Sequence, residues 1–444
     1  MSVDFRVRDF AYPTRILRLR RFFERSQWLP LEELVSYQNK RLREVVRQAY
    51  WHVPYYRRIF DSRRLKPEDI RDIRDLEKLP FLRREDVRTN LSDLRADNAA
   101  LFRPGPASTS GTTGTPLQFL VDKPSNILEF AYYWRHWSWA GYRLGDRFAD
   151  VRYDYFVRRA DTTDDVWAYQ PHLRRLLLNS MRIAPDRIAE YAKALRKFRP
   201  RFIRARPVSL YCLALFLRER KLNGIQFQAA FTGGETVLPQ HRQIIESTFG
   251  CRVLDSYGHM ERCIAVSQCP HGGYHVNPEY GIIEVVDTKS TPEGTMVGRL
   301  IGTSLHKMAM PFLRYEVDDL IEMYTDGRRC PCGRTLPLVK AVYGRKRDVI
   351  LTPDGRRIPS LFNVFHYAPG IRFFQIVQED VSRLVVRIVR GKDYTFHSEE
   401  SLNFWLRRFI GDGMKIDVEY ISENDLVRDH TGRPQPVVSR VSIW

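Results

Sequence analysis

The sequence lacks the features that would place the chain in a membrane or outside the cell. It contains no run of about 18 apolar residues, so no membrane-spanning helix is expected. The first residues, Met1 to Arg6, lack the apolar core of a secretory signal peptide. Cysteine is scarce, at 6 of 444 residues, which favours free thiols or a metal site over a disulfide framework. We therefore expect a cytoplasmic protein.

Acidic residues are also few relative to basic ones. The chain has 53 Asp and Glu against 72 Lys and Arg, a net charge of +19. This balance favours anionic partners, among them nucleotides, coenzyme A, an acidic carrier protein, nucleic acid and lipid headgroups. Because the charges are scattered, an arginine-rich composition without a specific partner remains the alternative. A nucleic-acid partner is not expected, since no recognised binding module is present.

Periodicity indicates an α/β protein. Apolar residues between 14 and 50 recur at spacings of three and four, which predicts helix. Between residues 125 and 220, strand-like and helix-like runs alternate, which predicts a parallel sheet with helices. Such sheets bind ligands at the carboxyl ends of their strands.

The stretch 107–116 reads Ala-Ser-Thr-Ser-Gly-Thr-Thr-Gly-Thr-Pro. Its glycines permit positive φ, so successive N–H groups can turn inward, and its hydroxyls add donors. We interpret it as a cradle for a polyphosphate. No Gly-Lys-Ser/Thr ends it, so its cation must come from elsewhere. A flexible linker is the alternative. The candidate binding residues are Ser108, Thr109, Ser110, Gly111, Thr112, Thr113, Gly114 and Thr115.

Two further motifs follow predicted strands. The strand at 227–231 runs into Thr232-Gly233-Gly234-Glu235, whose glycines let backbone lie against a planar ring; an ordinary strand-to-helix turn is the alternative. The strand at 251–256 delivers Tyr257-Gly258-His259-Met260-Glu261. A tyrosine supplies an aromatic face for a base, and a carboxylate suits a hard cation such as Mg²⁺.

The cysteines include a Cys-x-Cys pair at Cys330 and Cys332, turned by proline and glycine. Two such thiolates suit a tetrahedral ion, and Cys269 with His275 or His271 would complete the set. Three sulfurs and one nitrogen close the shell, so the predicted site is structural. Reduced thiols without a ligand are the alternative.

These motifs together resemble the adenylate-forming superfamily of acyl-CoA synthetases, nonribosomal adenylation domains and luciferases. Residues 109–116 look like its phosphate loop, and 257–261 like its "YG..E" motif. The chain is most similar to the phenylacetate-CoA ligase branch, and within it to relatives called capsular polysaccharide biosynthesis proteins. Leu117 stands where many superfamily members have lysine, as is usual in that branch. Many relatives in the branch hold a structural zinc ion.

The resemblance implies a role for each motif. Residues 108–115 would bind phosphates, Gly234, Glu235, Tyr257 and Gly258 would lie at the adenine, and Glu261 would hold Mg²⁺. Residues 309–319 resemble "amPliRYdiGD", whose last aspartate binds the ribose hydroxyls and falls on Asp319; Asp318 replaces the glycine of the motif. Residues 344–350 resemble "GR..D.i", in which Arg345 would touch ribose or phosphate.

The segment 431–440 resembles "sGKfr.viSr", in which the lysine bridges the carboxylate and the α-phosphate. Arg433 stands at that lysine position. A guanidinium still stabilises phosphate charge, but its planar fork is not interchangeable with an ammonium. The expected catalytic residues are Glu261, Arg433 and Thr112.

The expected architecture is an α/β fold in two parts. Residues 1–344 would form a large N-terminal domain with parallel and mixed sheets and a small β-subdomain built from strands at 281–286 and 298–303. Residues 345–348 would be a hinge. Residues 349–444 would form a small, mobile α+β lid, with strands at 373–377, 383–389 and 415–421 and a helix at 398–410.

The expected function is that of an ATP-dependent acid–thiol ligase. A carboxylic acid would attack the α-phosphate of ATP, pyrophosphate would leave, and the acyl-AMP would pass its acyl group to coenzyme A or a carrier-protein thiol. An amide- or ester-forming ligase with an amine or hydroxyl acceptor, or an adenylyltransferase, could share every motif. A nucleotide-binding scaffold impaired by Arg433 is a further alternative. ATP, Mg²⁺ and structural Zn²⁺ are the expected cofactors, and monomer and homodimer both stay open.

Overall fold

A computed structural model describes residues 13–109, 116–157, 164–345, 349–355, 357–359, 365, 368, 370–428, 435 and 437–441. The chain forms two compact units. The first comprises Met1–Ala107, Gln118–Val317 and Glu322–Ala341, and the second comprises Ser108–Leu117, Asp318–Ile321 and Val342–Trp444. The predicted boundary at 344–349 stays a prediction, because residues 346–348 lie outside the described part.

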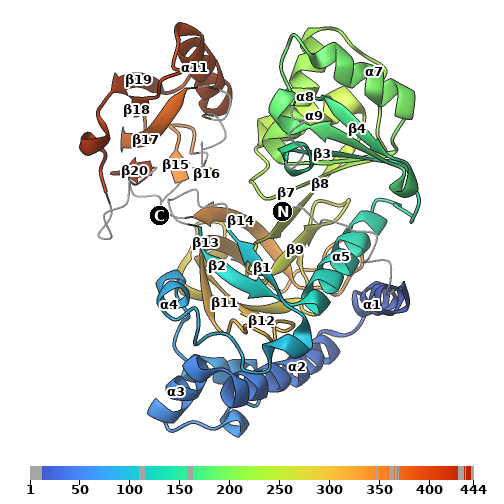
Figure 1. Cartoon of the computed structure of the whole chain (residues 1–444), viewed down its shortest axis with the longest axis vertical. Coiled ribbons are helices and arrows are strands. Elements are labelled where there is room, and N and C mark those ends of the chain that lie inside the picture. Colours follow the sequence, from blue (N-terminus) through green and yellow to red (C-terminus); the bar gives the residue numbers. More distant parts are fainter. Residues whose placement is uncertain are drawn as a thin grey trace. The chain divides into compact units, whose positions relative to one another are not determined.

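The N-terminal part of the first unit is helical (Figure 1). Its helices are α1 Pro13–Ser26, α2 Leu31–His52, α3 Pro54–Ser62 and α4 Arg84–Thr89. The helix expected between 14 and 50 is therefore two helices. The break falls at Pro30, since proline has no N–H to donate and disfavours helical backbone in the residue before it. In the described part of the chain, no helix is long and apolar enough to cross a membrane.

A twelve-stranded sheet has strand order β11-β12-β13-β14-β10-β9-β8-β7-β6-β3-β5-β4 and belongs to the first unit except for residues 318–321 of β13 and 342–345 of β14. The strands are β3 Phe148–Arg152, β4 Trp167–Gln170, β5 Arg175–Asn179, β6 Phe202–Ala205, β7 Ala229–Gly233, β8 Arg252–Gly258, β9 Ala265–Gln268, β10 Tyr274–Val276, β11 Gly281–Ser290, β12 Thr295–Ser304, β13 Tyr315–Tyr324 and β14 Leu338–Arg345. A separate pair is β1 Gly105–Ser108 with β2 Gln118–Val121.

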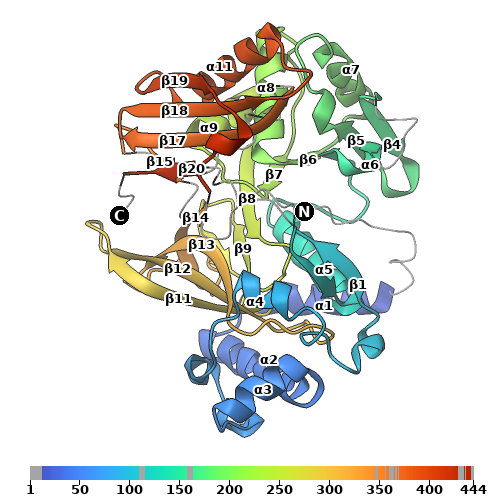
Figure 2. The same cartoon turned by 60° about the vertical axis from the view of Figure 1, so that its left-hand side comes forward.

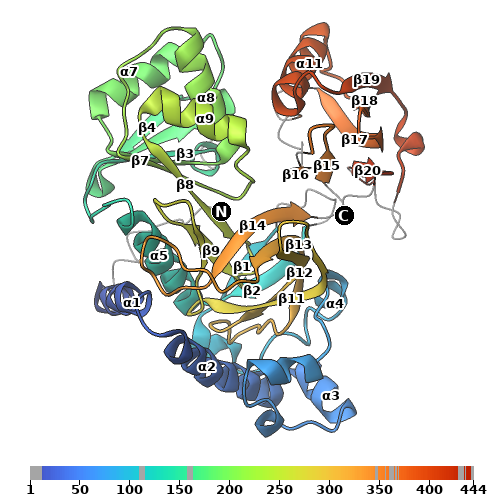
Figure 3. The same ribbon diagram turned by 180° about the vertical axis from the view of Figure 1, so that it is seen from behind.

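The sheet has a parallel part and an antiparallel part. Strands β5, β3, β6, β7 and β8 are parallel. Helices α7 Ile188–Phe198, α8 Pro207–Glu219 and α9 Pro239–Phe249 connect β5, β6, β7 and β8 in turn and lie over the parallel strands (Figure 3). The strands expected at 281–286 and 298–303 are β11 and β12, which pair antiparallel at the far end of the same sheet (Figure 2). The predicted α/β fold class is confirmed.

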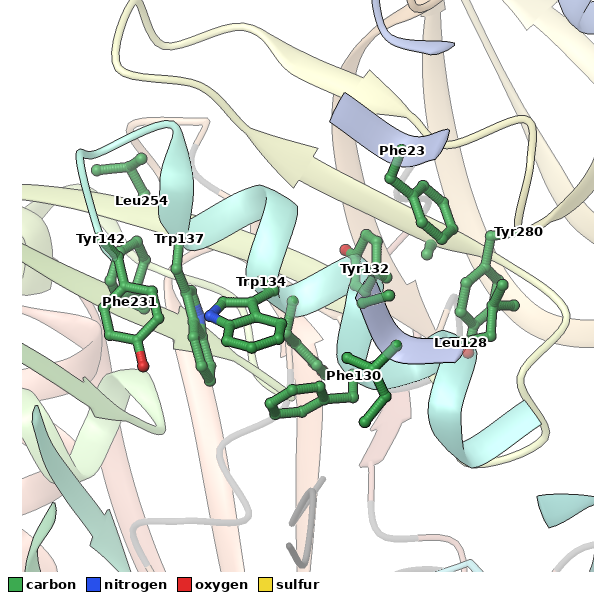
Figure 4. Close-up of a cluster of buried hydrophobic side chains, with 14 of the residues drawn as sticks. Phe23, Leu128, Phe130, Tyr132, Trp134, Trp137, Tyr142, Phe231, Leu254 and Tyr280 are labelled. Atoms are coloured by element: carbon green, nitrogen blue, oxygen red, sulfur yellow. The ribbon is translucent and has the colours of Figure 1, made fainter. Parts of the chain in front are cut away.

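Helix α5, Lys123–Ser138, lies in the core of the first unit. A helix that is apolar on all sides is typically buried, and α5 carries aromatic residues around its circumference. The Trp137 ring lies 4.9 Å from Phe148 and 6.0 Å from Phe231, measured between ring centroids. Figure 4 shows this aromatic cluster, which joins α5 to the parallel strands on one side and to Phe23 of α1 on the other. The short helix α6, Asp154–Val157, follows β3.

The second unit contains a small mixed sheet with order β19-β18-β17-β20. The strands of this sheet are β17 Ile371–Asp380, β18 Arg383–Arg390, β19 Lys415–Tyr420 and β20 Val437–Ser439. The unit also contains the strand pair β15 Val349–Leu351 and β16 Arg357–Pro359, and helix α11 Phe396–Ile410. Helix α11 buries Leu402, Leu406 and Phe409. The α+β character expected for the C-terminal part, with three strands and a helix, is confirmed.

A buried ion pair ties α1, α5 and the turn before β11 together. The Arg135 guanidinium donates to Glu279 at 2.7 Å and to the carbonyl oxygen of Phe23 at 3.1 Å, and it also hydrogen-bonds to Asn277. The side chains of Arg135 and Glu279 are fully buried. An ion pair in such a place is tolerated only while both partners are present.

We predict that Arg135→Met lowers the free energy of unfolding by about 4 kcal/mol, because it leaves the Glu279 carboxylate buried and uncompensated. The double variant Arg135→Met/Glu279→Leu should recover most of that loss. Denaturant titration of full-length protein checks both values. A double variant as unstable as the single one would contradict this explanation.

Candidate functional site

Strands β7 and β8 are parallel neighbours whose carboxyl ends lie at one edge of the sheet, where open α/β sheets bind ligands. A Cβ on Gly233 would stand 2.8 Å from Ser256 Oγ and 2.9 Å from the Ser256 carbonyl oxygen. Only glycine fits there. Gly234 follows with a φ of 83°, in the left-handed region that glycine favours. The next residue, Glu235, lies 3.6 Å from the Arg206 guanidinium and accepts from the Val208 N–H at 3.4 Å.

Glu261 is the buried acid at this edge of the sheet. It comes three residues after the end of β8 at Gly258 and is 6% exposed. Tyr315 Oη donates to Glu261 Oε1 at 2.8 Å, and His259 Nδ1 lies 3.1 Å from Oε2. Burial by itself raises the pKa of Glu261, but the hydrogen bond and charge of His259 and the Tyr315 hydroxyl lower it to about 2. Glu261 is therefore ionised throughout the neutral range.

Asp255, two residues before Tyr257, is a second buried acid. Thr232 Oγ1 donates to its Oδ1 at 2.7 Å, and Tyr274 Oη donates to Oδ2 at 3.2 Å. Burial raises the pKa of Asp255 to about 6, against the opposing effect of the Thr232 hydrogen bond and the Arg242 charge. The two acids of this edge thus differ in charge near pH 5.

Residues 108–117, which contain the predicted phosphate loop, and Asp319, the predicted ribose aspartate, belong to the second unit. The loop is closed at its base, since Thr109 N donates to the Leu117 carbonyl oxygen and Leu117 N donates to Thr109 Oγ1, both at 3.0 Å. Ser108 is the last residue of β1. Residues 110–115, which include Ser110, Gly111, Thr112, Thr113, Gly114 and Thr115, lie outside the described residues, as does Arg433.

Asp318 stands where the motif that this segment resembles has glycine. Its φ is 70°, in the left-handed region where glycine is the default and aspartate is tolerated better than most residues. The role of Asp319 at the ribose stays a prediction. Arg345 is the last residue of β14, and its side chain is not described.

Within the first unit, Gly234, Glu235, Tyr257, Gly258 and Glu261 gather at the ends of two adjacent strands. Ser108, Thr109, Asp319 and Arg345 belong to the other unit. That both groups serve one nucleotide site stays a prediction. Sequence reasoning missed the supporting roles of His259 and Tyr315, although both lie inside quoted motifs and an ionisable partner for a buried glutamate was the signal to look for.

A cysteine–histidine cluster lies elsewhere in the first unit. The ligand atoms of Cys269, His275, Cys330 and Cys332 all fall within 4.8 Å of one another. Cys269 Sγ and Cys330 Sγ are 3.5 Å apart, and Cys332 Sγ is 3.3 Å from His275 Nε2. Ligands around one tetrahedral zinc ion stand about 3.5 to 3.8 Å apart, so the donor set fits. Among the described residues, His271, His259 and Cys263 are not members of this group.

The cluster is oriented for binding. His275 Nδ1 donates to the Leu336 carbonyl oxygen at 3.2 Å, which leaves Nε2 directed at the sulfurs, a typical arrangement for a metal-bound histidine. Burial lowers the pKa of His275 to about 4, so the ring is neutral. Gly273 is required beside it, because a Cβ there would stand 2.8 Å from Cys330 Sγ.

We predict one metal ion per chain in protein purified without chelator, measured by inductively coupled plasma mass spectrometry. Cys330→Ser should lose the ion and lower the melting temperature by about 5 °C or more, because metal binding contributes directly to folding. Cys251→Ala, which removes a buried thiol outside the cluster, should keep the ion. Full metal content in the Cys330 variant would exclude this cluster as the site.

We predict that Asp255 makes stability fall as pH rises. Its folded pKa of about 6 exceeds the ordinary 3.8, so the folded state holds the proton more tightly. The contribution is therefore complete below pH 4 and is lost as pH rises through 6, a difference of about 3 kcal/mol. Asp255→Asn should remove this slope, as denaturant titrations at pH 4.5 and 7.5 would measure. An unchanged difference between the two pH values would contradict it.

Comparison with known proteins finds phenylacetate-coenzyme A ligases as relatives in sequence. The chain is 26% identical over 340 residues to the phenylacetate-coenzyme A ligase of Thermus thermophilus, covering 73% of each protein. It is 28% identical over 351 residues to the phenylacetate-coenzyme A ligase of Escherichia coli, covering 74% of this chain and 75% of that protein. Residues 350–439 match the family described as CapK C-terminal domain.

Solved structures agree on the fold. A 2-hydroxyisobutyryl-CoA ligase crystallised in its postadenylation state, with an acyl-AMP bound, superposes with a TM-score of 0.60 at 20% identity, over 94% of this chain and 91% of that one. The same ligase in its thioesterification state gives a TM-score of 0.58. The chain is thus similar in sequence to phenylacetate-coenzyme A ligases and has the fold of an acyl-CoA ligase, and its residues 350–439 match the CapK C-terminal domain family.

Proposed function

We propose that this protein activates a carboxylic acid with ATP, forming acyl-AMP and releasing pyrophosphate, and then transfers the acyl group to the thiol of coenzyme A or a carrier protein. Homology to ligases that act on an acid and coenzyme A supports this class of reaction. The observation that carries the proposal is the buried, ionised Glu261 at the carboxyl end of β8, directly after Tyr257-Gly258.

Each chemical requirement of this reaction is assigned to a residue. Glu261 would hold Mg²⁺, which, when bound, neutralises phosphate charge. Because Tyr315 and His259 fix the carboxylate, it needs no reorganisation when the ion arrives. Tyr257 offers a ring to the adenine, with Gly234, Glu235 and Gly258 around it, and Asp319 accepts from the ribose hydroxyls. The hydroxyls and N–H groups of 108–115, with Thr112 among them, and the cations of Arg345 and Arg433 would bind the phosphates.

The cysteine–histidine cluster would hold a structural Zn²⁺. Four protein ligands leave no open position for a substrate, so the ion would contribute to folding and not to the reaction. The cluster joins the turn between β9 and β10 to the segment before β14, which carries Cys330 and Cys332. It would therefore stabilise the strands next to β8.

The proposed acceptor of the acyl group is a thiol. The thiol of coenzyme A is favoured because the relatives are coenzyme A ligases. An amine or hydroxyl acceptor, or transfer of the adenylyl group itself, would leave the nucleotide residues unchanged. Product analysis by mass spectrometry with coenzyme A, carrier proteins and amines separates these outcomes.

We predict acid-dependent exchange of pyrophosphate into ATP with at least one member of a panel of aryl and aliphatic acids. Glu261→Gln should lower kcat/KM for exchange about 100-fold or more, because the amide keeps the shape but not the charge that a metal ion needs. Glu190→Gln, on the exposed face of α7, should leave exchange unchanged. A protein that binds ATP but supports no exchange with any acid would be the impaired scaffold instead.

A further inference from the structure

Lys307 is a fully buried cation that finds no hydrogen-bond acceptor in the part of the chain that the structure describes. It lies in the loop between β12 and β13 and is 0% exposed, and its Nζ makes no hydrogen bond to any described residue. The ammonium instead lies 3.6 Å from the ring centroid of Phe312 and 4.8 Å from that of Phe119. Ring faces recover only part of what it costs to remove an ammonium group from water. The ammonium group therefore keeps unused hydrogen-bond donors among the described residues.

The loop that carries Lys307 is held firmly. Asp122 accepts from Met308 N at 2.6 Å and from Ala309 N at 3.2 Å. Ser125 Oγ donates to the His306 carbonyl oxygen at 2.6 Å. The Asp122 carboxylate, at the start of α5, therefore accepts from the backbone of the same loop. Lys307 has a fixed position, and its Nζ makes no hydrogen bond within the described part of the chain.

The charges around Lys307 belong to the candidate site. Burial lowers the pKa of Lys307 to about 8, while Cys263, Asp122 and Glu261 act to raise it, so it remains protonated at pH 7. Arg262 acts on the same ammonium, and its Nε and Nη1 atoms are also buried without a hydrogen-bond partner. The Glu261 oxygens already interact with Tyr315 Oη and His259 Nδ1. Lys307 and Arg262 thus both have buried N–H donors that bond to no described residue.

We propose that Lys307 is an oxyanion-binding residue of the Glu261 site, which receives a carboxylate or phosphate oxygen of the reacting ligands, with Arg262 adding charge beside it. This inference rests on the proposed function. In adenylation, a carboxylate oxygen forms a bond to the α-phosphorus as the bond from that phosphorus to pyrophosphate breaks. Lys307 keeps its proton throughout and stabilises the negative charge on the oxygens. The acid or the α-phosphate could supply the oxygen.

The test compares full-length wild type with Lys307→Met by thermal denaturation in potassium chloride, pyrophosphate, phosphate and acetate at equal ionic strength. The variant should melt a few degrees higher than wild type without ligand, since it removes a buried charge that has no hydrogen-bond acceptor among the described residues. It should also lose the stabilisation that wild type gains from an oxyanion. A response to pyrophosphate and phosphate assigns the α-phosphate, and a response to acetate assigns the acid.

Activity gives a second readout. Lys307→Met should lower kcat for pyrophosphate exchange about 100-fold with a smaller change in the KM for ATP. Lys289→Met, on an exposed part of β11, is the control and should match wild type in every measurement. Lys307→Gln replaces the Met variant if that one does not fold.

Two results would overturn the inference. The first is that wild type gains no stability from any of the oxyanions. The second is that the Lys307 variant melts lower than wild type but is still stabilised by an oxyanion, since Lys307 would then only bridge two rings. The two proposals can also fail separately. If wild type shows no exchange activity but the variant loses the oxyanion response, the binding role of Lys307 is supported and the ligase reaction is rejected.

Discussion

The candidate site depends on keeping one carboxylate charged inside the protein. An isolated buried carboxylate would take up a proton, because removing its charge from water costs several kcal/mol. In this chain the Tyr315 hydroxyl and the His259 ring hold Glu261 in its ionised form and fix both oxygens in place. Those partners come from β13 and from the turn after β8, so the antiparallel and parallel parts of the sheet must both be formed before the acid is usable.

Close packing at the same edge sets a second constraint. Gly233 lets β7 approach Ser256 of β8 more closely than any side chain would permit, and Thr232 donates to Asp255 across the same pair of strands. The edge therefore contains one acid whose pKa is lowered by its partners and one whose pKa is raised by burial. Below about pH 6 Asp255 carries its proton while Glu261 stays ionised, so only one carboxylate charge remains at the edge. At neutral pH both acids are ionised.

Much of this could be read from the sequence, and the reasons are local. The loop at 107–116, the Tyr257–Glu261 motif and the Cys-x-Cys pair are short segments whose chemistry depends on neighbouring residues, so spacing suffices to find them. The alternation of strands and helices predicted the parallel part of the sheet. What the sequence could not supply is pairing between distant segments: that β11 and β12 extend the main sheet, that His275 and not His271 meets the sulfurs, and that Tyr315 reaches Glu261.

Lys307 could not have been predicted as a site residue from the sequence, because its residue type and its neighbours in sequence are those of an ordinary loop. A lysine between His306 and Met308 gives no sign of burial, and its isolation follows only from the packing of Phe119 and Phe312 around it. Asp122 acts on this ammonium through its charge, while its oxygens accept from the backbone of the same loop. A buried charge of this kind is destabilising on its own, so its presence argues for a ligand that compensates it. The free energy that the unliganded fold loses there would be recovered when an oxyanion binds, which makes binding of the reacting group and stability of the fold two measures of the same interaction.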